Sequence, residues 1–380
     1  MHTGNNRGRR FITRFLFGTV FIMTALVLAL GLSGCGEKTT AEGPAESQST
    51  VEKSEAGSAK AEEAVEEQPF DIAVFIPGVL AGSPLYQMLA DGVTQAVDAH
   101  ERATVKVVEG GFNQAEWRDK VTELAAAEKY ELIISSNPAL PEICARVSEN
   151  FPQQKFLLFD GYLEGNNSIY TFRYNQYEQA FLAGHMAGLV TTDGMPGANP
   201  ELKIGLIAGQ EYPDMNQAIK PGFLAGARMV NEDISLDFRV VGNWYDATKA
   251  AELAQSMVKA GVDVILPISG GANQGVIKTA EENDIYIHWF DTNGYANSPG
   301  RVIGSTALLQ EQAAREITEK AIEGSIRYGE AEVVGVADGW VTFILSDPLY
   351  TDTVPEELRM RQKALLEKMV NGDIQFEMPQ

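Results

Sequence analysis

The feature that most constrains this chain is a long series of short apolar runs that alternate with helical patterns from about residue 71 onward. Short apolar runs are typical of strands buried on both faces, and their alternation with helices predicts parallel sheets covered by helices on both sides. Strands are expected at 71–76, 103–108, 131–135, 155–160, 169–172, 203–208, 238–241, 263–267, 285–290 and 301–305. Helices are expected at 84–100, 114–128, 138–150, 177–190, 214–230, 247–260, 274–283 and 355–370. This is too many strands for one doubly wound domain, so we expect two α/β sheets.

The N-terminal segment has the order of an export signal. Four arginines and no acidic residue lie within 1–34, and an apolar run extends from 15 to 32. The run ends in Leu32-Ser33-Gly34-Cys35, which resembles the lipobox of bacterial lipoprotein signal peptides. The resemblance implies removal of 1–34 and lipidation of Cys35. The alternative is an uncleaved membrane anchor, because an apolar run of about 18 residues can span a bilayer.

The segment that follows Cys35 predicts a tether. Residues 36–68 hold nine acidic residues and three lysines, with no aromatic residue, Leu, Ile or Met. Such a segment cannot bury enough apolar surface to offset its chain entropy. We therefore expect 35–68 to be a lipidated, disordered, acidic linker, with a mean reach of about 30–35 Å.

The charge and the metal-binding residue types exclude several classes of function. The chain has 30 basic and 52 acidic residues, a net charge of -22, and a protein this acidic repels the phosphate backbone of nucleic acids. Its two cysteines and four histidines are scattered, so no metal cluster can be drawn from spacing. Neither a nucleic-acid partner nor a cofactor is expected. Cys144 and His185 fall within helical patterns and are read as packed residues.

Ligands of open parallel sheets bind beyond the carboxyl ends of the strands. Nine segments that follow expected strands are rich in Gly, Asn and aromatic residues, contain no basic residue, and hold no nucleophile–base pair. They are 77–86, 109–113, 136–138, 160–162, 209–214, 242–246, 269–275, 291–295 and 305–308. They therefore predict a site for a neutral, flat, polar small molecule and argue against an enzyme. Asp160 and Asp291 each end a buried strand, where a carboxylate can accept hydrogen bonds from a ligand or cap the next turn.

Two further segments after strands carry candidate ligand contacts. Trp244 can stack on a flat ring, or can pack as a core tryptophan between helix and sheet. Gly270 and Gly271 open a helix and can let backbone N–H groups approach a ligand, or can form a tight turn. The spacing is neither that of a phosphate-binding loop nor that of a dinucleotide-binding fingerprint.

Several motifs together resemble the basic membrane protein family of substrate-binding lipoproteins, whose best-known branch receives purine nucleosides for an ABC importer. The motifs are EQAFLAG at 178–184, KIGLIAG at 203–209, GFLAGA at 222–227, GVDVI at 261–265 and GG through GVI at 270–277. The resemblance implies a type I periplasmic-binding-protein fold, in which two doubly wound α/β lobes are joined by a three-crossover hinge. It further implies ABC permease and ATPase partners and a lipid-anchored location at the cell membrane, facing the periplasm or exterior.

The resemblance also implies domain limits and roles for individual residues. One lobe is expected over 69–172, completed by about 292–325, and the other over 173–291, completed by about 326–380. By the family pattern, Trp244 stacks on the base and Asp160 reads its edge. Gly270 and Gly271 lie near the sugar, and Asp291 binds sugar hydroxyls.

The chain departs from the family pattern at three polar positions, now occupied by Pro77, Leu85-Tyr86 and Leu308. These departures argue against a nucleoside as the ligand and favour a wider flat ring between Tyr86 and Trp244. Further amides come from Asn113, Asn137 and Asn293. The preferred ligand is therefore riboflavin or a similar flavin, as in some relatives of this family. A purine nucleoside is the alternative, and an interaction protein without a small ligand is the structural alternative.

Overall fold

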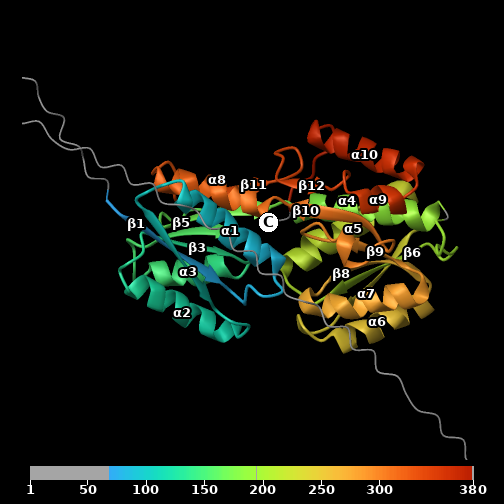
Figure 1. The fold of residues 1–380 in the computed structure, drawn as a ribbon, viewed down its shortest axis with the longest axis horizontal. Helices are drawn as coiled ribbons and strands as arrows, with labels where there is room; N and C mark the ends of the chain where they lie inside the picture. The colour runs from blue at the N-terminus through green and yellow to red at the C-terminus, as the bar shows by residue number, and fades with distance from the viewer. Residues whose placement is uncertain (1–67, 194, 379–380) are drawn as a thin grey trace, which may run out of the picture. The chain divides into compact units, whose positions relative to one another are not determined.

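The computed structural model describes residues 68–193 and 195–378, so the predicted signal segment, Cys35 and nearly all of the predicted linker lie outside the described residues. Strands and helices alternate over most of the chain, as the apolar runs predict (Figure 1). The strands are β1 (Phe70–Ile76), β2 (Ala103–Glu109), β3 (Leu132–Ser136), β4 (Lys155–Phe159), β5 (Ile169–Tyr174), β6 (Lys203–Ala208), β7 (Ser235–Val240), β8 (Val262–Ile268), β9 (Tyr286–Trp289), β10 (Val302–Leu308), β11 (Ala331–Val334) and β12 (Val341–Phe343).

Eight of the helices lie close to the expected positions, whereas α8 and α9 were not expected from the sequence. They are α1 (Pro84–Asp98), α2 (Gln114–Ala126), α3 (Leu140–Ser148), α4 (Gln176–Thr192), α5 (Lys220–Val230), α6 (Ala247–Lys259), α7 (Asn273–Asn283), α8 (Gln310–Ile322), α9 (Pro348–Thr353) and α10 (Glu356–Val370). A π-helix at Met215–Ile219 precedes α5, so the helix expected at 214–230 is not one regular α-helix.

The strands form two six-stranded sheets, one in each lobe. The first has the order β11-β5-β4-β3-β1-β2 and is parallel throughout. The second has the order β12-β10-β9-β8-β6-β7 and is parallel except for the antiparallel pair β10–β12. Helices α1 and α8 pack together in the first lobe, as do α2 and α3, while α4 packs on α5 and α6 on α7 in the second (Figure 1). The described residues, 68–193 and 195–378, belong to one compact unit.

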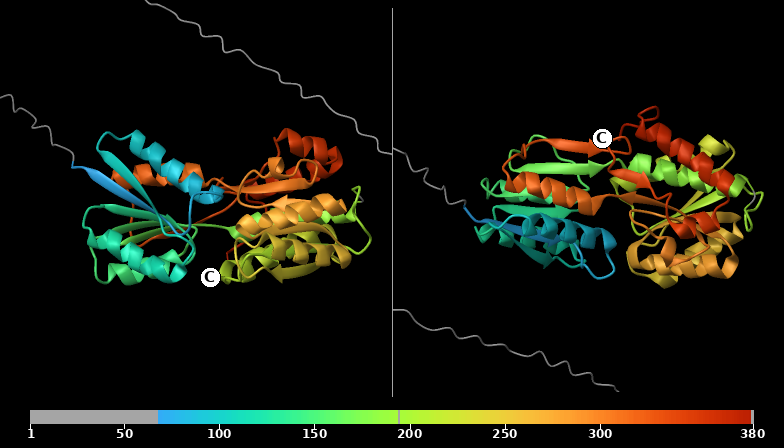
Figure 2. Two further views of the ribbon diagram at one scale, coloured as in Figure 1. Left: turned by 60° about the horizontal axis from the view of Figure 1, so that its bottom comes forward. Right: turned by 45° about the horizontal axis from the view of Figure 1, so that its top comes forward.

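The chain passes between the lobes three times, which agrees with the predicted type I fold. It leaves the first sheet after β5 to enter α4, returns after β10 to enter α8, and leaves again between β11 and β12. Figure 2 shows α8, in orange, beside the blue and cyan elements of the first lobe.

The strands near the end of the chain are distributed differently from the expected completing segments. β10, inside the segment 292–325 expected to complete the first lobe, pairs in the second sheet. β11, inside the segment 326–380 expected in the second lobe, pairs in the first. Hydrogen bonding explains both placements, because β10 continues the parallel ladder from β9 and β11 extends the edge beside β5.

Glycines explain why α4 and α5 pack so closely. A Cβ atom at Gly226 would collide with the carbonyl oxygen of Phe181, and one at Gly184 would collide with the backbone of Phe223. Larger residues would push the two backbones apart. The glycines of the EQAFLAG and GFLAGA motifs therefore fix the contact between these helices.

The two residues read as packed are buried, as expected. Cys144 is fully buried in α3 with a free thiol, and burial raises the pKa of that thiol. His185 lies in α4 with its Nδ1 2.7 Å from Oε1 of Gln362. Within residues 68–193 and 195–378, no helix is long and apolar enough to cross a membrane. The same residues hold no His, Cys, Asp or Glu cluster that could bind a metal ion.

Candidate ligand site at the carboxyl ends of the strands

A buried ion pair joins the carboxyl ends of the two sheets. Arg173 in β5 of the first lobe donates from Nη2 to Oδ1 of Asp214, which follows β6 in the second lobe. Their side chains are only 11% and 8% exposed. Removing one partner from such a pair leaves an uncompensated buried charge, so the pair holds this part of the interface together.

Asp160 lies directly beyond β4 beside this pair. Its φ of 55° is in the left-handed region, and its Oδ1 accepts a hydrogen bond of 3.0 Å from Nε2 of Gln176. Burial raises the pKa of Asp160 well above its usual value, and the carboxylates of Asp214 and Asp291 raise it further. Arg173 acts in the opposite direction. The carboxyl group therefore lies among charges from both lobes.

Asp291 comes from the second lobe, just beyond β9. It also has a positive φ, of 71°, and its Oδ1 accepts a hydrogen bond of 3.1 Å from Nε2 of Gln179. Burial raises the pKa of Asp291 to about 6, while the hydrogen bond from Gln179 lowers it. Asp160 and Asp291, both identified from the sequence, thus each bond a glutamine of α4 and lie near enough for the charge of Asp291 to act on Asp160.

Arg173, Asp214 and Tyr212 were not identified from the sequence. The strand-end segments considered from the sequence leave out the residues after 172, where β5 continues for two residues and carries Arg173. An arginine within the apolar run Phe172–Tyr174 could have been the signal, since a buried charge needs a partner. Tyr212 lies after β6, and burial and the nearby carboxylates of Asp291, Asp160 and Asp214 raise its pKa.

Trp244 lies in the turn between β7 and α6 and is half-buried. Its ring centroid is 6.3 Å from that of Tyr212, with the two planes at 43°. A Cβ atom at Gly209 would lie 2.5 Å from Cε3 of the indole, so only glycine lets the chain pass beneath the ring. The indole therefore packs against Tyr212 and Gly209 of its own lobe but stays partly exposed, which differs from a fully packed core tryptophan.

The predicted glycine turn lies against the backbone of Trp244. Gly270 has a φ of 59°, and a Cβ atom there would lie 3.0 Å from the carbonyl oxygen of Trp244. The same oxygen accepts a hydrogen bond of 3.3 Å from the N–H of Ala272. Gly270 and Gly271 are exposed at the surface of this turn. They thus have a structural role in seating the Trp244 segment, and their exposed backbone remains accessible.

Tyr86 and Asn137 lie together in the first lobe. Nδ2 of Asn137 donates to the Tyr86 hydroxyl over 3.3 Å, and Oδ1 of Asn137 accepts from the N–H of Ala139. Burial raises the pKa of Tyr86 to about 12, and the charge of Asp160 raises it as well. Tyr86 therefore lies near enough to Asp160 to sense its charge, while Trp244 belongs to the opposite lobe.

The amides of Asn113 and Asn293 are engaged in local turns. Asn113 caps α2 by accepting from the N–H of Ala115, and its Nδ2 donates to Glu116 over 2.7 Å. Nδ2 of Asn293 donates to Asp347 over 2.8 Å, and its Oδ1 accepts from the N–H of Tyr295. Capping accounts for both residues, and the structure gives neither a contact with Asp160 or Asp291.

A cavity of about 810 Å³ adjoins the ion pair on the hinge side. Its lining includes Arg173, Glu178, the edge strand β11 and the segment 375–378. The carboxylate of Glu178 accepts from the backbone N–H groups of Val336 at 2.8 Å and Phe376 at 3.2 Å. Glu178, the first residue of the EQAFLAG motif, thus ties α4 to the third crossover and to the C-terminal segment.

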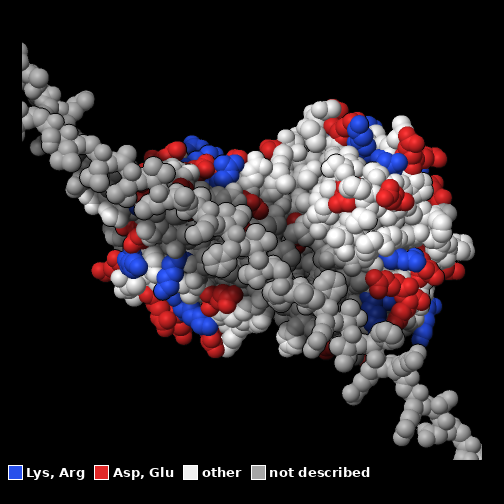
Figure 3. Space-filling view, viewed as in Figure 1, with Lys and Arg blue, Asp and Glu red and all other residues white. Residues whose placement is uncertain are grey.

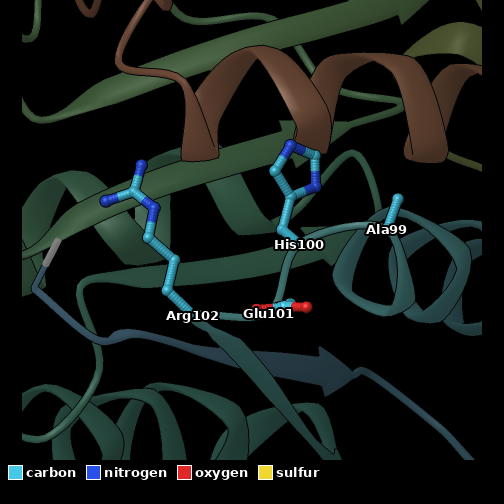
Figure 4. Close-up of a pocket in the computed structure, with 4 residues that line it drawn as sticks. All are labelled: Ala99, His100, Glu101 and Arg102. Carbon is cyan, nitrogen blue, oxygen red and sulfur yellow. The ribbon is translucent and has the colours of Figure 1, made fainter.

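A second hollow, of about 480 Å³, lies away from these residues. It is lined by Ala99, His100, Glu101 and Arg102 in the turn between α1 and β2 (Figure 4). This turn is at the amino end of β2, opposite to the strand ends that carry Asp160 and Asp291.

On the face seen in Figure 3, acidic and basic side chains are interspersed over both lobes.

Comparison with known proteins agrees with this architecture. A family model described as "ABC transporter substrate-binding protein PnrA-like" (Bmp) matches residues 70–375. The chain is 28% identical over 242 residues to a Lactococcus lactis protein named "ABC transporter nucleoside-binding protein BmpA", covering 59% of this chain and 66% of that one. It is 27% identical over 207 residues to "Basic membrane protein A" of Borreliella afzelii, covering 54% of this chain and 59% of that one. Among the curated relatives, the shares covered range from 42% to 67% of their own length.

Solved structures share the fold at lower sequence identity. A solute-binding protein of an ABC transporter system from Aeropyrum pernix superposes with a TM-score of 0.68 at 20% identity, covering 82% of this chain and 94% of that one. A protein described as a transcriptional activator of the comK gene from Bacillus halodurans gives 0.64 at 20% identity, covering 81% and 99%. The family model spans nearly all the described residues, so this chain belongs to the Bmp family of PnrA-like ABC transporter substrate-binding proteins, a family of binding proteins rather than of enzymes.

Proposed function

We propose that this protein is the receptor of an ABC importer and captures a small, flat heterocycle bearing a sugar or polyol chain between its two lobes. The observation that carries the proposal is the meeting of Asp160 and Asp291 from opposite lobes beside the Arg173–Asp214 pair. A ligand held by both carboxylates stabilises the closed arrangement of the lobes, which is the signal that a permease and its ATPase can read.

A purine nucleoside is the first candidate ligand. The Lactococcus relative is named a nucleoside-binding protein. Trp244 offers a stacking surface, Asp160 an acceptor for ring N–H groups, and Asp291 an acceptor for sugar hydroxyls. The sequence alone favours a flavin as the ligand. Because this relative is named a nucleoside-binding protein, we prefer a nucleoside.

Riboflavin is the second candidate, favoured by the surroundings of Asp291. Leu308, where the family pattern expects a lysine, is fully buried, and its N–H donates to the carbonyl oxygen of Asp291 over 3.0 Å. The sugar side of the site thus has an aliphatic neighbour, which suits a flexible ribityl chain as well as a ribose ring. Tyr86, in place of a smaller polar pair, supplies a second aromatic face.

The ligand can be identified by what the protein carries and by what it binds. The purified protein is denatured, the released small molecule is separated, and its ultraviolet and visible absorbance is recorded. A purine spectrum or a flavin spectrum names the class. Ligand-free refolded protein is then titrated with guanosine and with riboflavin by calorimetry. If neither compound binds and nothing is released, the proposed ligand class is wrong.

The anchor is a separate part of the proposal and concerns residues outside those described. Cys35 is the lipidated first residue of the mature chain, and 36–68 tether the body to the cell membrane on its periplasmic or exterior side. Replacing Cys35 with Ala should release the body into the soluble exported fraction, whereas Cys144→Ala, which alters a buried thiol, should leave it attached. A membrane-bound Cys35→Ala protein with an intact N-terminus would identify an uncleaved helix instead.

A further inference from the structure

Two glutamines at the start of α4 lie beside the carboxylates of the site. Gln176 is 5% exposed and Gln179 is fully buried, and a spacing of three residues places both on one side of the helix. Nε2 of Gln176 donates to Asp160, from the first lobe, over 3.0 Å. Nε2 of Gln179 donates to Asp291, from the second lobe, over 3.1 Å. One helix turn therefore holds the two carboxylates of opposite lobes.

Each glutamine also has a buried oxygen without a partner. Oε1 of Gln176 and Oε1 of Gln179 are inaccessible and accept no hydrogen bond in the described structure. Turning either amide over does not remove the problem, because it would place the oxygen against a carboxylate. A buried acceptor is costly until a donor reaches it, so these two oxygens call for N–H or O–H groups that the described residues do not supply.

The charges around the two glutamines point to the same kind of ligand. Asp160 and Asp214 lie near the guanidinium of Arg173, which is already paired with Asp214, and the charge of Asp291 also acts on Asp160. Three tyrosines, Tyr86, Tyr174 and Tyr212, also lie near these carboxylates, and burial and one or more of the carboxylate charges raise the pKa of each. Acceptors outnumber donors here, and an added negative charge such as a phosphate would be repelled.

We propose that Gln176 and Gln179 are positioning and specificity-determining residues, which hold Asp160 and Asp291 as acceptors and offer their own carbonyl oxygens to ligand donors. The ligand class that follows is an uncharged molecule with several N–H and O–H donors, and a nucleoside is accepted while its 5′-phosphate is refused. This inference rests on the proposed function of the same site.

The first test compares guanosine with guanosine 5′-monophosphate by calorimetry. The wild type should bind the nucleoside at least about 100-fold more tightly than the monophosphate. Gln176→Met and Gln179→Met, which keep the side-chain length but lose the amide, should each weaken guanosine binding by about 10-fold or more at any pH. Gln312→Met is the matched control, because Gln312 lies on the exposed side of α8 and contacts Glu316. Equal affinity for the two compounds, or unchanged binding in both variants, overturns the inference.

The second test uses a proton in place of an amide hydrogen. In Gln179→Glu, a protonated Glu donates to Asp291 as the amide does, whereas an ionised Glu repels it. Guanosine binding by this variant should be lost at neutral pH and return as the pH falls towards about 5, while wild-type binding should weaken over the same range. A merely structural role for Gln179 predicts parallel pH profiles for the two proteins, which would contradict the inference.

A measurement without ligand separates this inference from the proposed function. Side-chain carbon chemical shifts of the aspartates, followed by NMR during a pH titration, report the protonation of Asp291 directly. Its pKa should rise in Gln179→Met and stay unchanged in Gln312→Met. If that shift is seen but no nucleoside or flavin binds, the positioning role stands and the proposed function fails. If binding is tight and the pKa does not move, the positioning role fails alone.

Discussion

At the end of β7, Trp244 presents a half-buried indole that its neighbours only partly cover. Tyr212 lies beside it and Gly209 passes beneath it, which fixes the ring without enclosing it. Asp160 and Asp291 follow buried strands, and their positions near one another agree with the rule that strand ends of parallel sheets form binding sites, while their contact with a ligand stays a prediction. Asn113 and Asn293 were less predictable, since an amide that caps a turn has the same sequence signature as one that binds a ligand.

Replacing Trp244 with Ala should weaken ligand binding by about 5- to 150-fold, the loss expected of one stacking contact. The matched control is Tyr245→Ala, because Tyr245 is the adjacent residue and is 73% exposed. Titration calorimetry with guanosine and riboflavin measures both variants. Wild-type affinity in Trp244→Ala would make the indole a packing residue and would remove it from the site.

The raised pKa of Asp291 predicts a conflict between stability and binding. Its value of about 6 lies above the usual value of 3.8, so the folded protein binds the proton more tightly than the unfolded chain does. The ionised carboxylate is therefore destabilising above about pH 6. Asp291→Asn keeps an acceptor for Gln179 and should raise the melting temperature by a few degrees at neutral pH. The same substitution should lower the affinity for the ligand.

The gain in stability should shrink as the pH falls and vanish below about pH 4, where the carboxyl group is protonated in both states. Thermal unfolding across this range, with wild type in parallel, measures the difference. Asp347→Asn serves as the control, because Asp347 also accepts hydrogen bonds, at the half-buried start of α9. A constant difference at every pH would attribute the effect to shape rather than to charge.

The contact of α4 with α5 determines where the first crossover enters the second lobe. Gly226→Ala would place a methyl group against the carbonyl oxygen of Phe181 and 2.8 Å from the N–H nitrogen of His185. Both are backbone atoms that cannot move aside alone, so we expect a loss of at least about 1–3 kcal/mol in the free energy of unfolding. Urea unfolding tests this, with Met229→Ala on the exposed side of α5 as the control. A wild-type midpoint for Gly226→Ala would mean that the helices can separate freely.

Elements with strong local patterns were predictable, and those defined by distant partners were not. Strands β3 and β8 are buried throughout and β1 is buried from Ile72 on, and all three could be placed to within about two residues. β11 and β12 have only four and three residues, and each pairs with a strand more than 30 positions earlier, so nothing local marks them. For the same reason, the sheet to which β10 belongs could not be read from its own residues. The ion pair of Arg173 with Asp214 joins residues 41 positions apart and was missed for that reason.

At the scale of the whole molecule, a site built from both lobes predicts closure on the ligand. Saturating ligand should reduce the radius of gyration in small-angle scattering, and ligand at about 100 times its dissociation constant should stabilise the fold by about 2.7 kcal/mol. Trp244→Ala at the same ligand concentration is the control for binding. Tight binding with identical scattering curves would indicate a rigid site between fixed lobes.

The three passages between the lobes also determine when each lobe can complete its folding during synthesis. The first lobe needs 70–174 together with α8 and β11, and the second needs 176–308 together with β12 to α10. A chain that emerges from its N-terminus presents β1 to β5 early, but α8, which covers α1, appears only after most of the second lobe has been made. Neither half can be completed as an independent unit while the chain is still growing. The polypeptide must therefore remain incompletely folded until nearly all of it is available.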